Sequence, residues 1–342
     1  MSYPENDLKP GLISILMPVH NAGPFLRECL DSILQQTIPE WELIVVNDHS
    51  TDDSQEILCR YAQADPRIRV FQNSTKGIIP ALRLAIEKAG GSLVTRMDAD
   101  DMMVPEKLAD LRGRLVLAGE GHVAIGLVEY ISEGDLGDGF ARYQDWLNKL
   151  TLSGDNYRDL YRECVIPSPC WMVFRSDLDR AGGFSPDRYP EDYDLCFRFY
   201  EAGLKCLPSG RVLHKWRDHP GRASRNDPNY ADHTFIDLKV FWFLRLHHSG
   251  KSPIIVWGAG RKGKRIAKQL IRQGVEFQWV TNNRKKIGKR IYGMELLSDP
   301  LQNANRKARM IIAVASPEDQ EEITSYLNGE ALHPMQDYFY FC

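Results

Sequence analysis

The stretch LVTRMDADDMMV, residues 93–104, decides the fold class, because a short apolar run ends directly in a cluster of acids. The apolar half is typical of a buried strand, and the acidic half is typical of the loop that follows one. Ligands of open parallel sheets bind outside the carboxyl ends of the strands, so this loop is a candidate functional site. Alternate residues of an extended segment point to the same side, which places the carboxyl groups of Asp98 and Asp100 together.

Strand-like and helix-like segments alternate on both sides of this stretch. Short runs rich in branched apolar residues predict strands, and apolar residues spaced three and four apart predict the helices between them. The expected strands are residues 13–19, 42–46, 68–71 and 93–97, and the expected helices include residues 26–34, 57–61 and 81–88. Repeated strand–helix units predict an α/β domain whose mainly parallel sheet is covered on both faces.

The alternating pattern breaks once, in a polar turn followed by a helix rich in Phe and Trp. We therefore expect a first domain over residues 1–228, a helical linker over residues 229–250 and a small α/β domain over residues 251–342. Further strands are expected at residues 254–257, 275–280 and 310–314.

Charge is unevenly distributed along the 342 residues. The formal charge is -3, from 43 Lys and Arg against 46 Asp and Glu. Residues 251–342 hold 15 basic and 9 acidic side chains, which leaves 28 basic against 37 acidic in the rest of the chain. An acidic front part does not suit a nucleic-acid binder, whose affinity comes largely from Lys and Arg on phosphates. No nucleic-acid partner is expected, and small-molecule chemistry is favoured.

Cysteine usage and hydropathy indicate the compartment. The seven cysteines are odd in number and lack short paired spacings, so reduced, mostly buried thiols are expected rather than disulfides or a zinc site. No apolar run approaches the roughly 20 residues that cross a bilayer, and the start of the sequence lacks the order of a signal peptide. These features favour a cytoplasmic protein.

Two carboxylates that point at one spot repel each other unless a cation lies between them. Mg²⁺ or Mn²⁺, hard ions that bind few protein oxygens together with substrate phosphates, suits the pair formed by Asp98 and Asp100. The alternative is that residues 98–101 only cap the helix that begins near Pro105, because acids favour helix starts. The acids alone leave both interpretations open.

Four segments resemble, in order, the signature blocks of family 2 glycosyltransferases. They read MPVHNAGPFLRECLDSILQQT, ELIVVNDHSTDDS, TRMDADDMMVPEKL and GGFSPDRYPEDYDLCFRFYEAG, and the match runs from about residue 12 to about residue 225. The resemblance implies a GT-A, nucleotide-sugar-binding fold and an inverting transfer of a sugar from a nucleotide diphosphate, with uridine as the preferred base. It also implies a divalent metal and, as acceptor, a hydroxyl of a glycan or a related molecule.

The resemblance assigns donor-binding roles to residues in the loops after the first two strands. In this assignment the turn that contains Pro18, Val19 and Asn21 holds the base and ribose of the donor, together with Asp48. These roles rest on the family's pattern and are expectations for this chain.

Asp98 and Asp100 match the DxD motif of the same family. The resemblance implies that Asp98 contacts the ribose and that both aspartates bind the ion that bridges the two phosphates. This carry-over is physically reasonable, because a metal stabilises the negative charge that builds on the departing nucleoside diphosphate. Two neighbours are ambiguous: Arg96 either approaches the donor or forms a structural salt bridge, and Trp171 either stacks on a sugar ring or belongs to the core.

Glu191 and Asp192 occupy the position of the family's ED motif at the start of a helix. Inversion by one displacement needs a carboxylate opposite the leaving group that accepts the proton of the attacking hydroxyl. Asp192 is the expected general base, Glu191 an orienting or binding neighbour, and Asp194 a helix cap. The alternative is that the three acids only stabilise the first helical turn.

Residues 212–224 resemble the closing segment of the family, where His and Arg side chains lie over the diphosphate. His214 is the expected third metal ligand, with His219 as the alternative, because neutral imidazole binds metals well. Arg217 and Arg222 are expected to clamp phosphate oxygens with paired hydrogen bonds. The alternative for both arginines is a solvent-facing basic loop.

Gly258, Gly260 and Gly263 form a GxGxxG directly after an apolar strand, which is the context of a dinucleotide fingerprint and makes them a candidate second nucleotide site. The end of the next expected strand carries no acid for a ribose. This part resembles the small Rossmann-like modules appended to some sugar-modifying enzymes. Packing, homo-oligomer assembly or partner contact is therefore also expected of it, and its positive charge favours a peripheral contact with an anionic membrane surface.

Two other classes of function stay open on the sequence. The glycine fingerprint favours an NAD(P)-dependent oxidoreductase. A non-catalytic scaffold that binds nucleotides or carbohydrates would require that the acids be idle.

Overall fold

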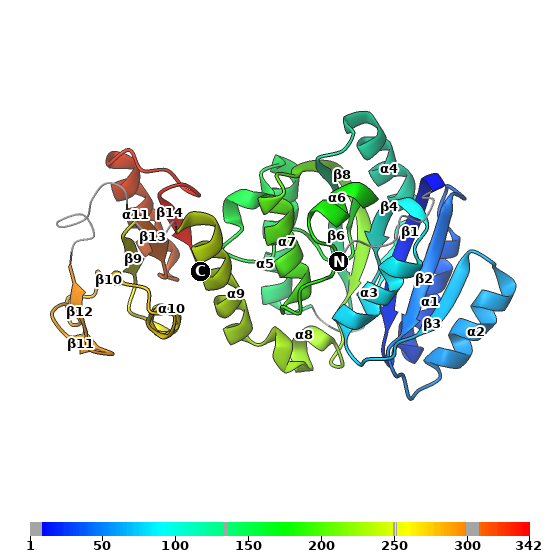
Figure 1. The fold of residues 1–342 in the computed structure, drawn as a ribbon, viewed down its shortest axis with the longest axis horizontal. Helices are drawn as coiled ribbons and strands as arrows, with labels where there is room; N and C mark the ends of the chain where they lie inside the picture. Colours follow the sequence, from blue (N-terminus) through cyan, green and yellow to red (C-terminus); the bar gives the residue numbers. More distant parts are fainter. Residues whose placement is uncertain (1–8, 133, 135, 249, 251, 299–307) are drawn as a thin grey trace. The chain divides into compact units, whose positions relative to one another are not determined.

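A computed structural model describes residues 9–132, 134, 136–248, 250, 252–298 and 308–342. The chain divides into two compact units (Figure 1). The first unit comprises Met1–Asn156 and Val165–Arg225, and the second comprises Tyr157–Cys164 and Asn226–Cys342. The Phe- and Trp-rich helix expected as a linker thus groups with the second unit, and a short segment from the middle of the chain joins it there.

The first unit is built on one eight-stranded sheet with the strand order β3-β2-β1-β4-β7-β6-β8-β5. Pairing is parallel across β3, β2, β1 and β4 and between β6 and β8, whereas β7 and β5 pair antiparallel with their neighbours. The strands are β1 (Lys9–Val19), β2 (Trp41–Asn47), β3 (Ile68–Gln72), β4 (Gly91–Arg96), β5 (Met102–Met103), β6 (His122–Ile131), β7 (Trp171–Phe174) and β8 (Lys205–Arg217). The expected mixed α/β architecture with a mainly parallel sheet is confirmed.

Helices lie between these strands and after the last of them. They are α1 (Gly23–Leu34), α2 (Ser54–Ala64), α3 (Ile78–Lys88), α4 (Lys107–Ala118), α5 (Asp138–Ser153), α6 (Arg175–Arg180), α7 (Glu191–Glu201) and α8 (Ala223–Asn226), with short 3-10 turns at Asn156–Asp159 and Pro228–Tyr230. In β2 every residue is buried, as expected for a strand covered by helices on both sides. The loops at the carboxyl ends of β1, β2 and β4 therefore start from a rigid layer.

The loops after β1 and β2 hold each other in place. The first backbone N–H groups of α1 are capped from the neighbouring loop: Ala22 donates to Ser54 Oγ at 3.0 Å and Gly23 to Asp52 Oδ2 at 2.9 Å. A Cβ on Gly23 would lie 1.9 Å from Asp53 Oδ1, so a larger residue there would require the Asp53 carboxylate to move. Helix starts need such acceptors for their free N–H groups.

The second unit contains a six-stranded sheet with the order β11-β12-β10-β9-β13-β14. Its elements are α9 (Asp232–His247), β9 (Ile254–Trp257), α10 (Arg261–Arg272), β10 (Phe277–Val280), β11 (Arg290–Ile291), β12 (Met294–Leu297), β13 (Arg309–Ile312), α11 (Pro317–Gly329) and β14 (Tyr338–Tyr340). The chain winds outward from β9 in both directions, which is the doubly wound arrangement expected of a Rossmann-like domain.

An aromatic cluster anchors the mid-chain segment in the second unit. Tyr161 is buried and stacks on Phe341 with ring centroids 5.1 Å apart, and its edge contacts Phe243 and Phe339. The side chains of the cluster come from three separate stretches of the chain, so its formation needs tertiary structure. Within the described residues, no helix is both long and apolar enough to span a bilayer.

Candidate active site

Arg96 joins the acidic loop after β4 to the start of α7. Its guanidinium lies 2.9 Å from Asp98 Oδ1 and, through a second nitrogen, 2.9 Å from Glu191 Oε1. Side-chain exposure is 6% for Arg96 and 4% for Glu191, so the pair is screened little by solvent. The two acidic motifs, 95 residues apart in sequence, therefore meet at one guanidinium. Of the two roles considered for Arg96, the structure shows the salt bridge.

Asp192 lies beside this ion pair in the first turn of α7. Its Oδ1 accepts a hydrogen bond of 2.7 Å from the backbone N–H of Tyr193. Burial and, secondly, the charge of Glu191 raise the pKa of Asp192 to about 7, and Arg96 opposes this shift. A carboxyl group with a pKa near neutral pH is suited to accept a proton during a reaction.

Three aspartates crowd the loop after β4. Burial, followed by the charges of Asp101 and Asp98, raises the pKa of Asp100 to about 6. The same causes, burial and then Asp98, raise the pKa of Asp101 to about 7. Helix α4 begins only at Lys107 and has no side-chain cap, so the aspartates do not serve as its cap. Like charges gathered in a buried place are the condition that a bound cation relieves.

The two candidate histidines lie in different surroundings. His219 Nε2 is 3.0 Å from Asp100 Oδ2, and its ring packs on Phe25 with centroids 4.4 Å apart. His214 is fully buried, with Nε2 2.9 Å from Asp101 Oδ2 and Nδ1 3.2 Å from Lys107 Nζ. Burial and the nearby ammonium lower the pKa of His214, which favours the neutral ring.

The contacts of His214 specify one tautomer. A proton on Nε2 is donated to Asp101, and the lone pair on Nδ1 accepts from Lys107. Such a ring has no lone pair left for a metal. The structure thus places His214 against Asp101 and His219 against Asp100, and which of the two meets a metal stays a prediction.

Arg217 and Arg222 both lie over the acidic loop and are not solvent-facing. Arg217 donates from Nε to the carbonyl of Asp100 at 2.9 Å, and its backbone N–H donates to Asp101 Oδ1 at 2.8 Å. Arg222 lies over the rings of Tyr130 and Trp216, with its guanidinium carbon 5.7 and 5.5 Å from their centroids. The charge of Asp101 helps to raise the pKa of Arg222.

Asp48 is held in a fixed orientation at the end of β2. Its carboxylate accepts hydrogen bonds from the Asn73 side chain at 2.7 Å and from the backbone N–H of Gly77 at 2.9 Å. His20 Nδ1 lies 2.6 Å from the backbone carbonyl of Asp48, which ties this position to the loop after β1. Asp48 thus lies beside the β1 loop, and its role in donor binding stays a prediction.

The β1 loop residues have different roles in the structure. Asn21 adopts a positive φ of 51°, and its side-chain oxygen accepts from the backbone N–H of Thr51 at 2.8 Å. Val19 is buried, and Pro18 precedes it at the end of β1. The contact of Asn21 is to the neighbouring loop, so this side chain shapes the site by fixing its backbone.

Two further expectations are settled by packing. Asp194 does not cap α7: its carboxylate is buried between Arg188 at 2.9 Å and Arg198 at 2.8 Å. Trp171 is 2% exposed and contacts Phe199 edge-on, so it belongs to the core and not to a sugar-stacking surface.

A cavity of about 460 Å³ opens beside the acidic loop. Its lining combines cationic, acidic, aromatic and small side chains and comprises Phe25, Ser132, Gly134, Arg217, Asp218, His219, Pro220 and Arg225. His219 connects the cavity to Asp100. Among the residues that the structure describes, no three His, Cys, Asp or Glu side chains converge as a ready-made metal cage. An ion here would need oxygens from a ligand to complete its shell.

The glycine fingerprint of the second unit has a packing explanation for two of its members. A Cβ on Gly263 would lie 1.9 Å from the carbonyl oxygen of Gly258, and one on Gly258 would lie 2.7 Å from the carbonyl of Ala313. Gly260 faces open space, with no atom within 4 Å of such a Cβ. Nucleotide binding at this motif stays a prediction.

Asp101 and Lys107 were not assigned a role from the sequence. Both are buried, and Lys107 donates to the carbonyl of Pro169 as well as to His214. A single sequence does not distinguish a buried lysine from an exposed one, because the charge and the length of the side chain are the same in both. The one signal that could have found Lys107 is its spacing, four residues before Leu111 on the buried face of α4.

Residues 14–182 match the family model described as glycosyl transferase family 2. The chain therefore carries a glycosyl transferase family 2 domain. Relatives include glycosyltransferase GlyG of Streptococcus pneumoniae serotype 4, 29% identical over 63% of this chain and 74% of GlyG. Glycosyltransferase GlyA of the same organism is 26% identical over 66% of this chain but only 33% of its own length. The chain therefore spans about a third of GlyA.

Solved structures share the fold of the family 2 domain. TarS residues 1–349 of S. aureus, crystallised with UDP-GlcNAc, has a TM-score of 0.54 and 19% identity, covering 77% of this chain and 72% of that one. The mannosyltransferase PcManGT of Pyrobaculum calidifontis, in complex with GDP-Man and Mn²⁺, has a TM-score of 0.50 and 20% identity over 76% and 69%. At these identities the likeness establishes the GT-A fold.

Proposed function

We propose that this family 2 enzyme transfers a sugar, with inversion, from a nucleotide-diphosphate sugar to a hydroxyl of a glycan or related acceptor. UDP-sugars are the proposed donors. The two structures of similar fold contain donors of this class, UDP-GlcNAc in TarS and GDP-Man in PcManGT. They support a nucleotide-diphosphate sugar as donor, but they do not distinguish uridine from guanosine.

The observation that carries this proposal is the contact of the two acidic motifs at Arg96. Through it the start of α7, which bears Asp192, lies against the loop that bears Asp98. In the proposed reaction Asp192 accepts the proton of the acceptor hydroxyl as its oxygen bonds to the anomeric carbon. The bond from that carbon to the diphosphate breaks, and the nucleoside diphosphate leaves with the electron pair. General-base help of this kind contributes roughly 10²- to 10⁴-fold to the rate.

We infer that the loop after β4 holds a divalent ion. Asp98 and Asp100 supply hard carboxylate oxygens, and His219, in contact with Asp100, is the proposed histidine neighbour. Burial, followed by the charges of Asp101 and Asp98, raises the pKa of Asp100, and a bound cation would offset both effects. When bound, Mg²⁺ or Mn²⁺ would supply positive charge to stabilise the diphosphate leaving group.

The remaining site residues orient this machinery. Glu191 holds Arg96 and thereby Asp98, and Arg217 holds the backbone of Asp100. Asp48, fixed by Asn73, is the proposed contact for the base or ribose of the donor.

Release of nucleoside diphosphate tests this proposal directly. Full-length protein is incubated with a panel of UDP- and GDP-sugars, with and without Mn²⁺, and the released nucleotide is measured. We expect metal-dependent release from at least one UDP-sugar and its loss in Asp192→Asn. No release from any sugar nucleotide, combined with a nicotinamide absorbance change, would favour the oxidoreductase class. Ligand-induced stabilisation that Asp192→Asn leaves unchanged, without any turnover of the wild-type protein, would favour a scaffold.

A further inference from the structure

We propose that the second unit carries a surface that binds anionic lipid membranes. This basic face comprises Lys264, Lys268 and Arg272 on α10 together with Arg284, Lys285 and Lys289 in the loop after β10. The surface lies outside the active site of the family 2 domain and does not depend on the reaction proposed above.

The sequence of this region is strongly basic. From residue 261 to residue 290 it contains eleven basic residues and a single acid, Glu276. The basic residues are Arg261, Lys262, Lys264, Arg265, Lys268, Arg272, Arg284, Lys285, Lys286, Lys289 and Arg290. Glu276 directly precedes β10, so it lies at the opposite end of that strand from the basic loop.

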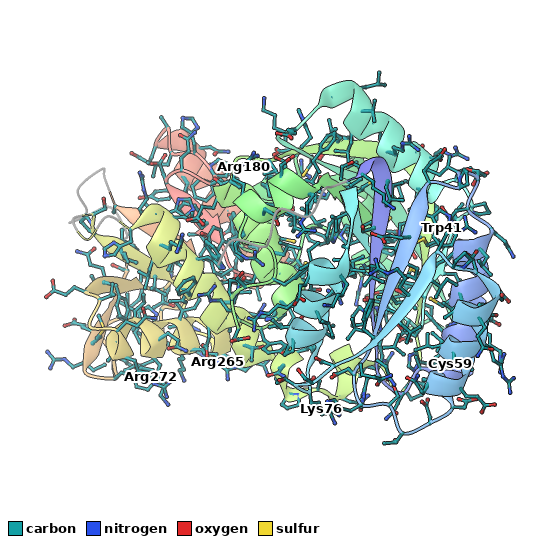
Figure 2. The ribbon with its side chains drawn as sticks, turned by 45° about the vertical axis from the view of Figure 1, so that its right-hand side comes forward. Trp41, Cys59, Lys76, Arg180, Arg265 and Arg272 are labelled. Atoms are coloured by element: carbon teal, nitrogen blue, oxygen red, sulfur yellow. The ribbon has the colours of Figure 1, made fainter. Side chains whose placement is uncertain are left out.

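Helix α10 turns its basic residues away from the sheet. Its buried positions are Gly263, Ile266, Ala267 and Leu270, which leaves the opposite side of the helix to solvent. Lys264, Lys268 and Arg272, spaced four apart, are all exposed. Figure 2 labels Arg265 and Arg272 along the outer edge of this helix. Within the described part of the chain, Lys264, Lys268 and Arg272 form no ion pair with an acid.

The loop after β10 continues the same surface. Strands β9 and β10 are parallel neighbours, so the loop after β10 and the start of α10 lie at the same sheet edge. Lys286 Nζ donates to the carbonyl of Ala259 at 2.9 Å and fixes the loop against the amino end of the helix. Arg284 and Lys285 are exposed beside it. Arg290 is left out of the basic face because Glu295 is its cross-strand partner.

An acidic helix lies on the other face of the sheet in the second unit. Helix α11 carries Glu318, Asp319, Glu321 and Glu322. The crossovers from β9 to β10 and from β13 to β14 run in opposite directions, and right-handed crossovers therefore place α10 and α11 on opposite faces of the sheet. Figure 1 shows the two helices well apart within this unit. An anionic plane would thus attract the α10 side and repel the α11 side.

Exposed apolar side chains among these cations favour a lipid surface over a nucleic acid. Ile271 is 43% exposed next to Arg272, Ile287 is 38% exposed in the loop, and Tyr292 is 53% exposed. When a protein binds the phosphates of a nucleic acid, such apolar side chains stay exposed to water. When it binds a membrane, they insert into the boundary between the headgroups and the acyl chains. Basic residues near an anionic leaflet add the electrostatic part of the binding.

Vesicle co-sedimentation of the full-length protein tests this inference. We expect binding to phosphatidylcholine vesicles that contain phosphatidylglycerol and none to pure phosphatidylcholine, with a decrease as salt rises. The triple variant Lys264→Gln/Lys268→Gln/Arg272→Gln should lower the partition coefficient at least about 10-fold. Ile271→Ser should weaken the part of the binding that survives high salt.

The matched control removes three exposed cations from the first unit, as Arg60→Gln/Lys149→Gln/Lys205→Gln, and should bind within about twofold of wild type, since the charge removed is equal. Equal binding to both vesicle types, or full binding by the α10 variant, would overturn the inference. Binding to duplex DNA without binding to vesicles would assign the face to nucleic acid instead. Nucleotide release without vesicles should be the same in the α10 variant as in wild type, which separates this test from that of the proposed reaction.

Discussion

The guanidinium of Arg96 lies 2.9 Å from Glu191 Oε1, and both side chains are buried. The same guanidinium holds Asp98, so one side chain sets the spacing between the loop after β4 and the first turn of α7. Removing one partner of a buried ion pair leaves the other charge uncompensated, which typically costs about 3–5 kcal/mol. Arg96 is therefore both a structural link and, in the proposed reaction, a positioning residue.

Arg96→Lys should reduce kcat about 10- to 100-fold, because a single ammonium cannot hold two carboxylates in the guanidinium geometry and small misplacements are costly in catalysis. The matched control is Arg175→Lys, a buried arginine that pairs with Asp179 and contacts the carbonyl of Ile86. Both variants should lower the melting temperature, but only the first should lower kcat in a nucleotide-release assay. Equal kcat in both would remove the positioning role.

Protonation of Asp192 should lower the rate of the reaction at acidic pH. Its pKa in the folded protein is raised to about 7, so the base form is lost as pH falls below that value. The pH profile of kcat/KM should therefore rise through about pH 7 and then level off, and Asp192→Asn should lower turnover at least about 100-fold. A profile that is flat from pH 5 to pH 8 would contradict the assignment.

The same raised pKa makes a prediction about stability. A carboxyl whose pKa is higher in the folded than in the unfolded chain stabilises the fold at low pH, and this contribution is lost as pH rises through about 7. Asp192→Asn removes the buried charge, so it should raise the melting temperature at pH 8 by at least about 2 °C and change it less at pH 5. Thermal melts without divalent ions check this, and a lower melting temperature at pH 8 speaks against it.

The two histidines should behave differently when removed. His219→Ala should raise the Mn²⁺ concentration needed for activity, and for metal-induced thermal stabilisation, about 10-fold. His214→Ala should instead lower stability by about 3 kcal/mol, because Asp101 and Lys107 lose their shared partner. Titration of the melting temperature with Mn²⁺ distinguishes the two. A metal response abolished by the His214 change in a still-folded protein would restore the original assignment.

The glycines of the second unit offer a test of packing. Gly263→Ala should destabilise the protein by about 3 kcal/mol or more, because its Cβ would overlap the carbonyl oxygen of Gly258. Gly260→Ala should be nearly neutral, because its position is open. Thermal melts measure both. Equal tolerance of the two substitutions would show that the close approach is absent in solution.

Periodicity predicted β1 to β4 of the first sheet and β9, β10 and β13 of the second, but not β5 to β8, β11, β12 or β14. The strand expected at residues 13–19 is β1 (Lys9–Val19), and the one expected at residues 93–97 is β4 (Gly91–Arg96). The partners of charged side chains were harder to predict from the sequence. Asp194 was expected to cap a helix, and only the fold shows that Arg188 and Arg198 lie beside it. A cap is a local preference, whereas an ion pair depends on which chains the fold brings near.

By itself the sequence determined seven of the strands, the helices next to them and the loops that bear the acids, because apolar spacing and turn residues act over a few neighbouring positions. Tertiary structure decided which acids meet, that Arg96 joins them, and that His219 rather than His214 faces Asp100. The physical reason is range: hydrogen bonds and ion pairs form within about 3 Å, and contacts between residues far apart in the chain exist only after the core has closed.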